Sequence, residues 1–244
     1  MNNMELNVIK MKKLLFFLLL SINIFSQTIF DSFELPNEYK RIYNDNYSKW
    51  LINQPIILDE EVKTYNGEII KGLGYSYIAK FNYNIGNKNL HQCADAIIYL
   101  NAMFNYQIGD WYKIKYSSNS GKVMAFTSFQ YASKKNDFKS YLEYVWTWAG
   151  TWSLEKYDTY KIDIKTIRPG DIFIQGGSPG HAIIVVDVVE NKKNIKKVML
   201  AQSYMPAQET HILLNNNYNV WHNLKEDIEN LGFTRFNLKR FKHK

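Results

Sequence analysis

Residues 168–189 read RPGDIFIQGGSPGHAIIVVDVV, and this stretch decides the fold class. Two apolar runs, 172–174 and 182–189, are rich in β-branched residues, and a turn rich in glycine and proline separates them. Runs of this kind between turn residues are typical of buried strands. The stretch therefore predicts two strands of one sheet, with His181 at the point where the turn enters the second strand.

The same sheet continues downstream, and helices precede it. Residues 197–203 form a third apolar run, which the polar turn 191–194 separates from the second. A connection this short joins antiparallel strands. Upstream, apolar residues recur at helical spacing within residues 90–106, which predicts a helix. A helical half followed by an antiparallel sheet indicates the α+β class.

The other segments give weaker signals. We expect a short helix at 45–51, an extended segment at 56–58, a hairpin at 62–70, and strands at 74–83 and 111–115. Residues 138–152 carry aromatic and apolar side chains at helical spacing, which predicts another helix.

Residues 1–26 have the form of a cleavable secretory signal peptide. Three lysines at positions 10–13 precede the unbroken apolar run 14–20, and the small residue Ser26 follows. The run is too short to span a bilayer core of about 30 Å as a permanent helix. A buried N-terminal helix and an uncleaved anchor are the alternatives. We expect the protein to be exported, to the periplasm or to the exterior of the cell.

The remaining chain suits one domain. Met11 stands directly before two of the lysines, so residues 1–10 can be an upstream extension. Without residues 1–26, about 218 residues remain, and we expect them to form a single domain, 27–244. No later segment is long and apolar enough to span a membrane, so no stable membrane span is expected after signal cleavage.

The charge balance is modestly basic. The formal net charge is +7 for the whole chain, and about +5 once the basic leader is removed. Residues 239–244 carry much of this excess. Nucleic acid is a poor partner for an exported protein, and an anionic cell-envelope surface suits the charge better. The alternative is a basic tail that is simply solvated.

Cys93 is the single cysteine, so the chain forms no internal disulfide. It follows Gln92 at the start of the helix expected at 90–106. A thiol there faces the positive end of the helix dipole, which lowers its pKa and favours the nucleophilic thiolate. Asp95 in the same turn opposes that effect in part. The alternative is an inert buried cysteine.

His181 is a candidate base for this thiol. Gln202 lies on the third expected strand, which the turn at 191–194 places beside the start of the second. Gln202 or its neighbour Ser203 can therefore accept a hydrogen bond from the imidazole and complete a nucleophile–base–orienter arrangement. We expect the Cys93 thiol within hydrogen-bonding reach of the ring. Gly176 and Gly177 leave room for a substrate backbone. The alternative is a structural turn histidine.

The pattern resembles the papain-like amidases of the CHAP and NlpC/P60 group. The residues that carry the resemblance are Gln92-Cys93 opening a helix, then Pro169-Gly170-Asp171, then Gly180-His181 before a β-branched strand. The resemblance implies a papain-like core in which a helix carrying Cys93 packs on the antiparallel sheet. It implies that Cys93 attacks an amide, His181 is the base, Gln202 orients it and Gln92 contributes to an oxyanion site. The substrate would be a peptide or peptidoglycan-like molecule, with no cofactor and no metal.

The mature chain as a whole resembles an uncharacterised exported bacterial family, domain of unknown function 4846. The segments that carry this likeness are 92–96, 170–177, 179–182 and 201–208. The family implies no activity.

Three departures from the amidase pattern favour a second hypothesis, a catalytically inactive fold. Cys93 and His181 are 88 positions apart, so a large helical, aromatic-rich insertion at about 110–165 must be housed. Cys93 is followed by Ala-Asp where NlpC/P60 members have Ser-Gly, and Gln202 stands where Asn, Glu or His is usual. A neutral amide orients an imidazole but stabilises imidazolium less.

The aromatic segment 146–152, which includes Trp148, offers a binding role for such an inactive protein. Exposed aromatic faces with polar rims suit sugar stacking, so a glycan- or envelope-binding module is the alternative function. A tryptophan-rich helix packed into the core is the simpler interpretation. The spacing of histidines and Cys93 indicates no metal site.

Overall fold

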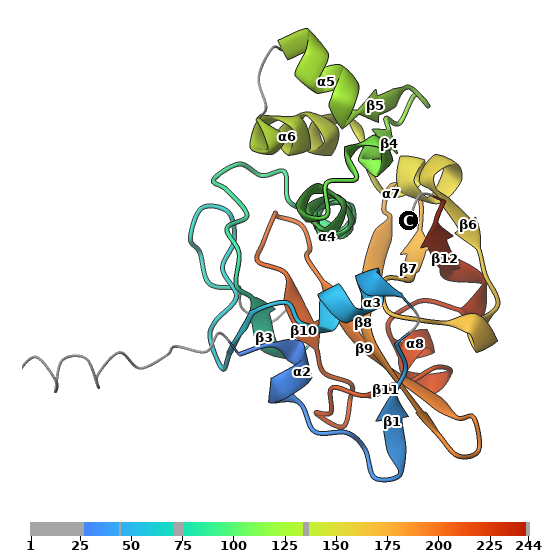
Figure 1. The fold of residues 1–244 in the computed structure, drawn as a ribbon. Coiled ribbons are helices and arrows are strands. Elements are labelled where there is room, and N and C mark those ends of the chain that lie inside the picture. The colour runs from blue at the N-terminus through green and yellow to red at the C-terminus, as the bar shows by residue number, and fades with distance from the viewer. Residues whose placement is uncertain (1–26, 44, 71–75, 134–136, 243–244) are drawn as a thin grey trace, which may run out of the picture.

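The computed structural model describes residues 27–43, 45–70, 76–133 and 137–242, and Figure 1 shows their arrangement. The predicted signal peptide lies outside these residues. None of the helices in the described ranges has the length and apolar character needed to cross a bilayer.

One antiparallel sheet forms the centre of the fold. Its main path runs β2-β3-β10-β9-β8-β7-β12-β6, while β1 pairs with β8 and β11 pairs with β9. The strands are β1 (Tyr39–Arg41), β2 (Ile56–Leu58), β3 (Tyr77–Phe81), β6 (Thr159–Lys161), β7 (Ile172–Gln175), β8 (His181–Asn191), β9 (Lys196–Gln202), β10 (His211–Leu213), β11 (His222–Asn223) and β12 (Leu238–Phe241). The three strands predicted from the apolar runs are β7, β8 and β9, paired antiparallel in chain order. The chain is α+β, as predicted.

The helices are short except for one. They are α2 (Ile29–Ser32), α3 (Asn46–Ile52), α4 (Cys93–Gln107), α5 (Phe126–Ser133), α6 (Phe138–Trp148), α7 (Thr151–Ser153) and α8 (Glu226–Asn230), with a π-helical turn at Leu154–Asp158 and 3₁₀ turns at Trp111–Lys113, Ile164–Thr166 and Arg235–Asn237. β4 (Lys115–Ser117) and β5 (Val123–Ala125) form a separate hairpin.

Two predicted elements differ from the structure. Residues 111–115 were expected to form a strand, but Trp111–Lys113 is a 3₁₀ turn closed on Asp110, and the strand begins at Lys115. The helix predicted at 138–152 ends at Trp148, because Ala149 and Gly150 are both extended. A new helix, α7, begins at Thr151, so Trp152 does not belong to the same helix as Trp148.

The sheet separates two apolar clusters. Ala182 and Ile184 of β8 belong to the cluster that contains Ile97 of α4, whereas Ile183 and Val185 belong to the cluster on the other face. Successive side chains of a strand point to opposite faces. Even-numbered residues at this end of β8 therefore face α4, and odd-numbered residues face away from it.

The segment 110–165 divides between two places: its first part, which carries β4, β5, α5 and α6, packs on α4, whereas β6 at its end belongs to the main sheet. Figure 1 shows α5, α6 and the β4–β5 hairpin on the side of α4 away from the sheet. Inside this layer, buried Tyr116 donates a hydrogen bond to Asn101 of α4 over 2.8 Å, and buried Tyr141 donates to the Met124 carbonyl over 2.8 Å. The part that packs on α4 is rich in aromatic residues, and it contains the β4–β5 hairpin as well as helices.

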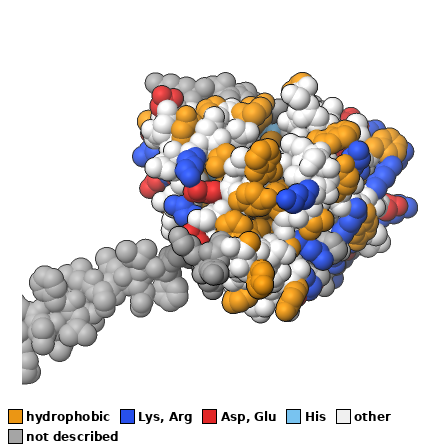
Figure 2. All heavy atoms as spheres, turned by 90° about the horizontal axis from the view of Figure 1, so that it is seen from above, with side chains coloured by type: hydrophobic (Ala, Val, Ile, Leu, Met, Phe, Trp, Pro, Cys, Tyr) orange, Lys and Arg blue, Asp and Glu red, His pale blue; other side chains and the backbone are white. Residues whose placement is uncertain are grey.

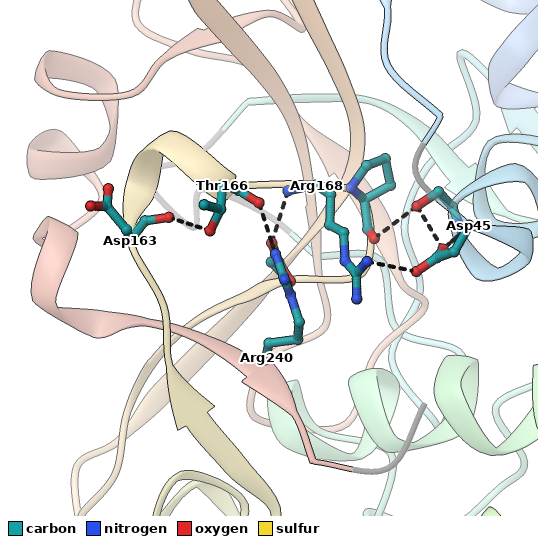
Figure 3. Close-up of polar contacts among 8 residues, drawn as sticks. Asp45, Asp163, Thr166, Arg168 and Arg240 are labelled. Carbon is teal, nitrogen blue, oxygen red and sulfur yellow. Dashed lines mark hydrogen bonds and ion pairs between the residues drawn. The ribbon is translucent and has the colours of Figure 1, made fainter.

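The turn that leads into β7 is tied down from two sides. Arg240 of β12 contacts the buried Asp171 carboxylate with Nε–Oδ1 at 2.7 Å, and Arg168 lies 3.1 Å from Asp45, the N-cap of α3 (Figure 3). Charge-assisted pairs of this kind are stronger than neutral hydrogen bonds. They fix the start of the β7–β8 pair, whose far end carries His181.

Candidate functional site

Cys93 is the first residue of α4. The helix begins there, three residues after the predicted start, because Gln92 acts as its N-cap. The backbone N–H of Gln92 donates to Oδ2 of Asp95 over 3.0 Å, which closes a capping box. Cys93 therefore lies in the first helical turn, as predicted.

The sulfur of Cys93 lies at the end of β8. The pairing of β8 with β9 ends at Ile184 and Ala201, so Ala182 lies beyond it. The backbone amides of Ala182 and of the first helical residues, Cys93 and Ala94, lie close enough to favour the charged form of the thiol and so act to lower its pKa. The thiol thus lies where backbone donors converge.

The predicted low pKa of Cys93 is wrong. Burial raises the pKa of its thiol to about 11, and the charge of Asp95 adds to the rise, while the backbone amides only partly offset it. Cys93 is 7% exposed, and desolvation penalises a charged sulfur more than the helix terminus favours it. At neutral pH the resting thiol is therefore protonated.

Asp95 is buried beside this thiol. Burial raises the pKa of its carboxyl group well above the ordinary value, against the opposing hydrogen bond from the Gln92 amide. Its Oδ1 is buried and makes no hydrogen bond within the described ranges. The carboxyl group is therefore an unsatisfied polar group at the base of the site.

His181 and Gln202 are joined as predicted, and His211 extends the contact. Nε2 of His181 lies 2.7 Å from Oε1 of Gln202, and Nε2 of Gln202 lies 3.4 Å from Nε2 of His211. His211 is paired directly opposite Gln202 on β10, so both side chains share one face of the sheet. Three adjacent strands thus present a row of polar side chains.

The hydrogen bonds of this row determine its tautomers. Nδ1 of His211 lies 2.9 Å from the Glu209 carbonyl, so it carries the proton and its Nε2 accepts from the Gln202 amide group. Oε1 of Gln202 then accepts from Nε2–H of His181. Nδ1 of His181 is left with a free lone pair, and it is buried without a partner in the described part of the chain.

Burial keeps this ring neutral. Desolvation lowers the pKa of His181, and the hydrogen bond to Gln202 opposes the shift. A neutral imidazole with an unprotonated Nδ1 is the form that a general base requires.

The predicted hydrogen bond between Cys93 and His181 is absent from the described structure. Ala182 faces α4, so its neighbour His181 points to the other face, where its ring packs 5.8 Å from Phe233 and 5.0 Å from Tyr204 between centroids. The structure thus brings His181 to Gln202 and brings Cys93 to the backbone of the next residue. It does not bring the thiol and the imidazole into hydrogen-bonding contact.

A pocket of about 360 Å³ opens at the start of α4. Its walls come from the helix start, the 177–180 turn and the α6–α7 connection, and they include Gln92, Cys93, Asp95, Trp146, Trp152 and Gly177. Figure 2 shows hydrophobic side chains gathered in the middle of the face that carries α5 and α6, with basic side chains around them.

The glycines of the turn have different roles. Gly177 lines the pocket with φ of +148°, a conformation that favours glycine. Gly176 packs against its own chain instead: its N–H donates to Oε2 of Glu155 over 2.7 Å, and a Cβ there would lie 3.1 Å from Cα of Trp152. Gly180 is equally confined, because a Cβ would lie 2.3 Å from Oγ1 of Thr151.

The tryptophans divide between two hollows. Trp146 lines the Cys93 pocket and packs on buried His91, with ring centroids 5.2 Å apart. Trp152 lines the same pocket and is 47% exposed. Trp148, the predicted substrate-binding residue, is 57% exposed and lines an adjoining groove of about 690 Å³ with Lys122. The interpretation that the whole segment 146–152 packs into the core is therefore wrong.

The sequence did not indicate His211 or Thr151 as parts of the site, and it indicated Gly180 only as a member of the Gly-His motif. The pairing of residue 211 with residue 202 could have pointed to His211, but register is not readable from this sequence. In the described ranges, no group of three or more His, Cys, Asp or Glu side chains is placed to hold a metal ion.

Comparison with known proteins gives a family and no activity. No curated protein and no solved structure matches the chain. The model of one protein family matches residues 29–134 and 127–243, which together cover most of the sequence. The chain belongs to that family, which is described as domain of unknown function 4846.

Proposed function

We propose that the protein is an exported cysteine amidase or peptidase with a papain-like core, which cleaves peptide or cell-wall amide bonds. The observation that carries the proposal is the 2.7 Å contact between His181 and Gln202, because it leaves Nδ1 of His181 as a free acceptor. Cys93, whose sulfur lies at the amide of the adjacent Ala182, is the nucleophile that this base serves. Order along the chain, cysteine helix first and histidine strand second, agrees with the papain-like arrangement.

The resting pair is neutral, which determines the first step. As Sγ of Cys93 attacks the carbonyl carbon of the amide, its proton passes to Nδ1 of His181. The tetrahedral intermediate collapses when the C–N bond breaks, and the proton moves from His181 to the leaving amine. Water then attacks the thioester, gives its proton to the same nitrogen, and releases the carboxylic acid and the thiol.

Donors for the developing oxyanion are available at the helix start. The backbone amides of Cys93 and Ala94 point from the first turn of α4. The side chain of Gln92 lines the pocket, and among the described residues its Nε2 makes only a long contact of 3.4 Å to Asn89. It is free to turn toward a bound carbonyl oxygen.

The attack requires Cys93 to approach Nδ1 of His181. Catalytic hydrogen bonds are often long or poorly aligned without substrate, and they tighten when it binds. The short turn 177–180 forms a wall of the pocket beside Cys93 and leads directly into His181, so the proposal requires a bound substrate to shift this turn and bring the imidazole toward the thiol.

Hydrolysis of isolated cell-wall peptides tests the proposal. The wild-type protein should release new amino groups, and Cys93→Ser and His181→Ala should each lower the rate by at least 100-fold, the usual scale of a base or nucleophile. Thr147→Ala, an exposed change on the pocket rim, is the matched control and should leave most of the rate. Equal rates for wild type and Cys93→Ser would refute the proposal.

The exposure of Trp148 favours a second candidate function, binding of a glycan or envelope polymer without catalysis. Its groove combines the indole with hydroxyl, amide and lysine side chains from Ser118, Asn119 and Lys122. Binding of purified cell-wall polysaccharide tests this role. It should persist in Cys93→Ser and weaken by at least tenfold in Trp148→Ala, and retention of full binding in Trp148→Ala would exclude it.

A further inference from the structure

A second pocket lies away from Cys93, at the end of the chain that carries β11 and α8. It has a volume of about 420 Å³, and its walls include Ser76, Asn215, Tyr218, His222 and Asp227. Most of these side chains are polar. The proposed amidase site uses none of them.

His222 has a hydrogen-bond acceptor without a partner in this pocket. Its Nδ1 lies 3.1 Å from the Val220 carbonyl, so Nδ1 carries the proton and Nε2 keeps a lone pair. The side chain is fully buried, and Nε2 has no hydrogen-bond partner within the described ranges. Buried polar atoms are nearly always satisfied, so this nitrogen indicates a ligand that donates.

Asp227 adds a negative charge to the same pocket. Its Oδ2 accepts the Asn223 N–H over 2.7 Å and the Asn215 amide group over 3.3 Å. No hydrogen bond from a described residue reaches its other oxygen. Asn215 itself is fully engaged, because its Oδ1 accepts the N–H groups of residues 217 and 219.

His222 and Asp227 thus offer two acceptors without a described partner, one of them anionic, while Ser76, Asn216 and Asn230 add hydroxyl and amide groups to the walls. Tyr218, 77% exposed, adds an aromatic ring at the rim, which attracts cations. Glu226 and Glu229 on α8 make this part of a basic protein locally acidic. A metal ion is a poor occupant, because no three ionisable ligands gather in the described ranges.

We propose that this pocket binds a primary alkylammonium group, with His222 Nε2 and the Asp227 carboxylate accepting its N–H donors and Tyr218 covering its alkyl chain. Such a group is found on lysine-like side chains and on small amines. The site is independent of the thiol site and does not rest on the proposed function.

Titration with n-propylammonium, followed by NMR of the amide of Asn223 and the ring of His222, tests the proposal. The signals should shift and saturate with n-propylammonium, while n-propanol, the neutral analogue, should bind at least tenfold more weakly. Asp227→Asn should weaken n-propylammonium binding at least tenfold. Glu229→Gln removes the same charge from an exposed position of the same helix and should change the affinity less than twofold.

Three results would overturn the proposal. One is equal affinity for n-propanol and n-propylammonium in the wild-type protein, a comparison that needs no variant to fold. The second is equal weakening by Glu229→Gln and Asp227→Asn, which would indicate general attraction to an acidic helix. The third is a response of His222 to zinc alone, with no response to n-propylammonium.

Discussion

Nε2 of His181 lies 2.7 Å from Oε1 of Gln202, and the same amide group reaches His211 on the following strand. The amide of Gln202 thus joins the half-buried imidazole of His181 to the buried imidazole of His211 and gives each a defined tautomer. Nε2 of His211 can only accept, so the NH2 group of Gln202 must point toward it. The carbonyl oxygen of Gln202 then faces His181 and accepts from Nε2–H of that ring. The free lone pair on Nδ1 of His181 follows from this order.

Removal of the Gln202 amide should release the tautomer of His181. In Gln202→Met, which keeps the length of the side chain, the proton of His181 is no longer confined to Nε2. ¹⁵N NMR of the wild type should show Nδ1 of His181 unprotonated, and the variant should show a mixture of tautomers. A wild-type spectrum with Nδ1 protonated would contradict the hydrogen-bond order.

His211 should make the protein sensitive to acid. Burial lowers the pKa of His211 to about 4, well below its value of about 6.5 in an unfolded chain. Between these values the unfolded chain binds more protons, so stability present at neutral pH is lost as the pH falls below 6.5. At pH 5 one such histidine costs roughly 2 kcal/mol.

Urea unfolding at pH 7 and pH 5 measures this loss. His211→Gln should reduce the difference between the two pH values by about 2 kcal/mol, since glutamine does not titrate. Gln202→Met keeps every titrating group and removes the hydrogen bond that opposes the lowered pKa of His181, so it should not reduce the difference. An unchanged difference in His211→Gln would place the acid sensitivity elsewhere.

Asp95 should weaken the fold at neutral pH. Burial raises the pKa of its carboxyl group, so the folded protein binds a proton that the unfolded chain has lost above about pH 4. Stability from this group therefore falls as the pH rises. Asp95→Asn keeps an oxygen for the Gln92 amide and should be more stable than wild type at pH 7, and less dependent on pH between 4 and 7. A loss of stability at pH 7 in thermal unfolding would contradict this.

Gly180 should tolerate no side chain. A methyl group there would lie 2.3 Å from Thr151 Oγ1 and 2.7 Å from the Gly177 carbonyl, and backbone cannot move aside cheaply. Gly180→Ala should cost about 1–3 kcal/mol in chemical denaturation and distort the pocket wall. Gly150→Ala is the matched control, because its methyl group would meet only the Asn119 side chain at 3.7 Å. Equal stability of the two variants would show that the turn is not confined.

The sequence predicted the parts of the fold whose signals are local. β7, β8 and β9 are apolar runs between turns, and the helix that begins at Cys93 has regular apolar spacing. Residues 111–113 were misjudged because their aromatic side chains suit a strand, while the turn depends on a backbone hydrogen bond to Asp110.

The candidate site was only partly predictable, because its chemistry depends on tertiary structure. The pairing of Gln202 with His181 followed from a short turn between two strands. The raised pKa of Cys93 depends on burial by distant segments, and the contribution of His211 depends on the register of β10 against β9. The side chain of His181 points away from α4, because Ala182 faces α4 and neighbouring side chains of a strand point to opposite faces.

Acylation of Cys93 by p-nitrophenyl acetate, followed against pH in wild type and His181→Ala, tests the central claim most directly. Because the pKa of the thiol is raised and that of His181 is lowered, the base should be available throughout the neutral range. With increasing pH, the acylation rate should therefore increase up to about pH 6.5 and then stay level through pH 8. In His181→Ala the rate should be at least 100-fold lower. A rate that instead climbs steadily toward pH 11, and is the same in His181→Ala, would mean that Cys93 reacts as an isolated thiolate and that His181 is not its base.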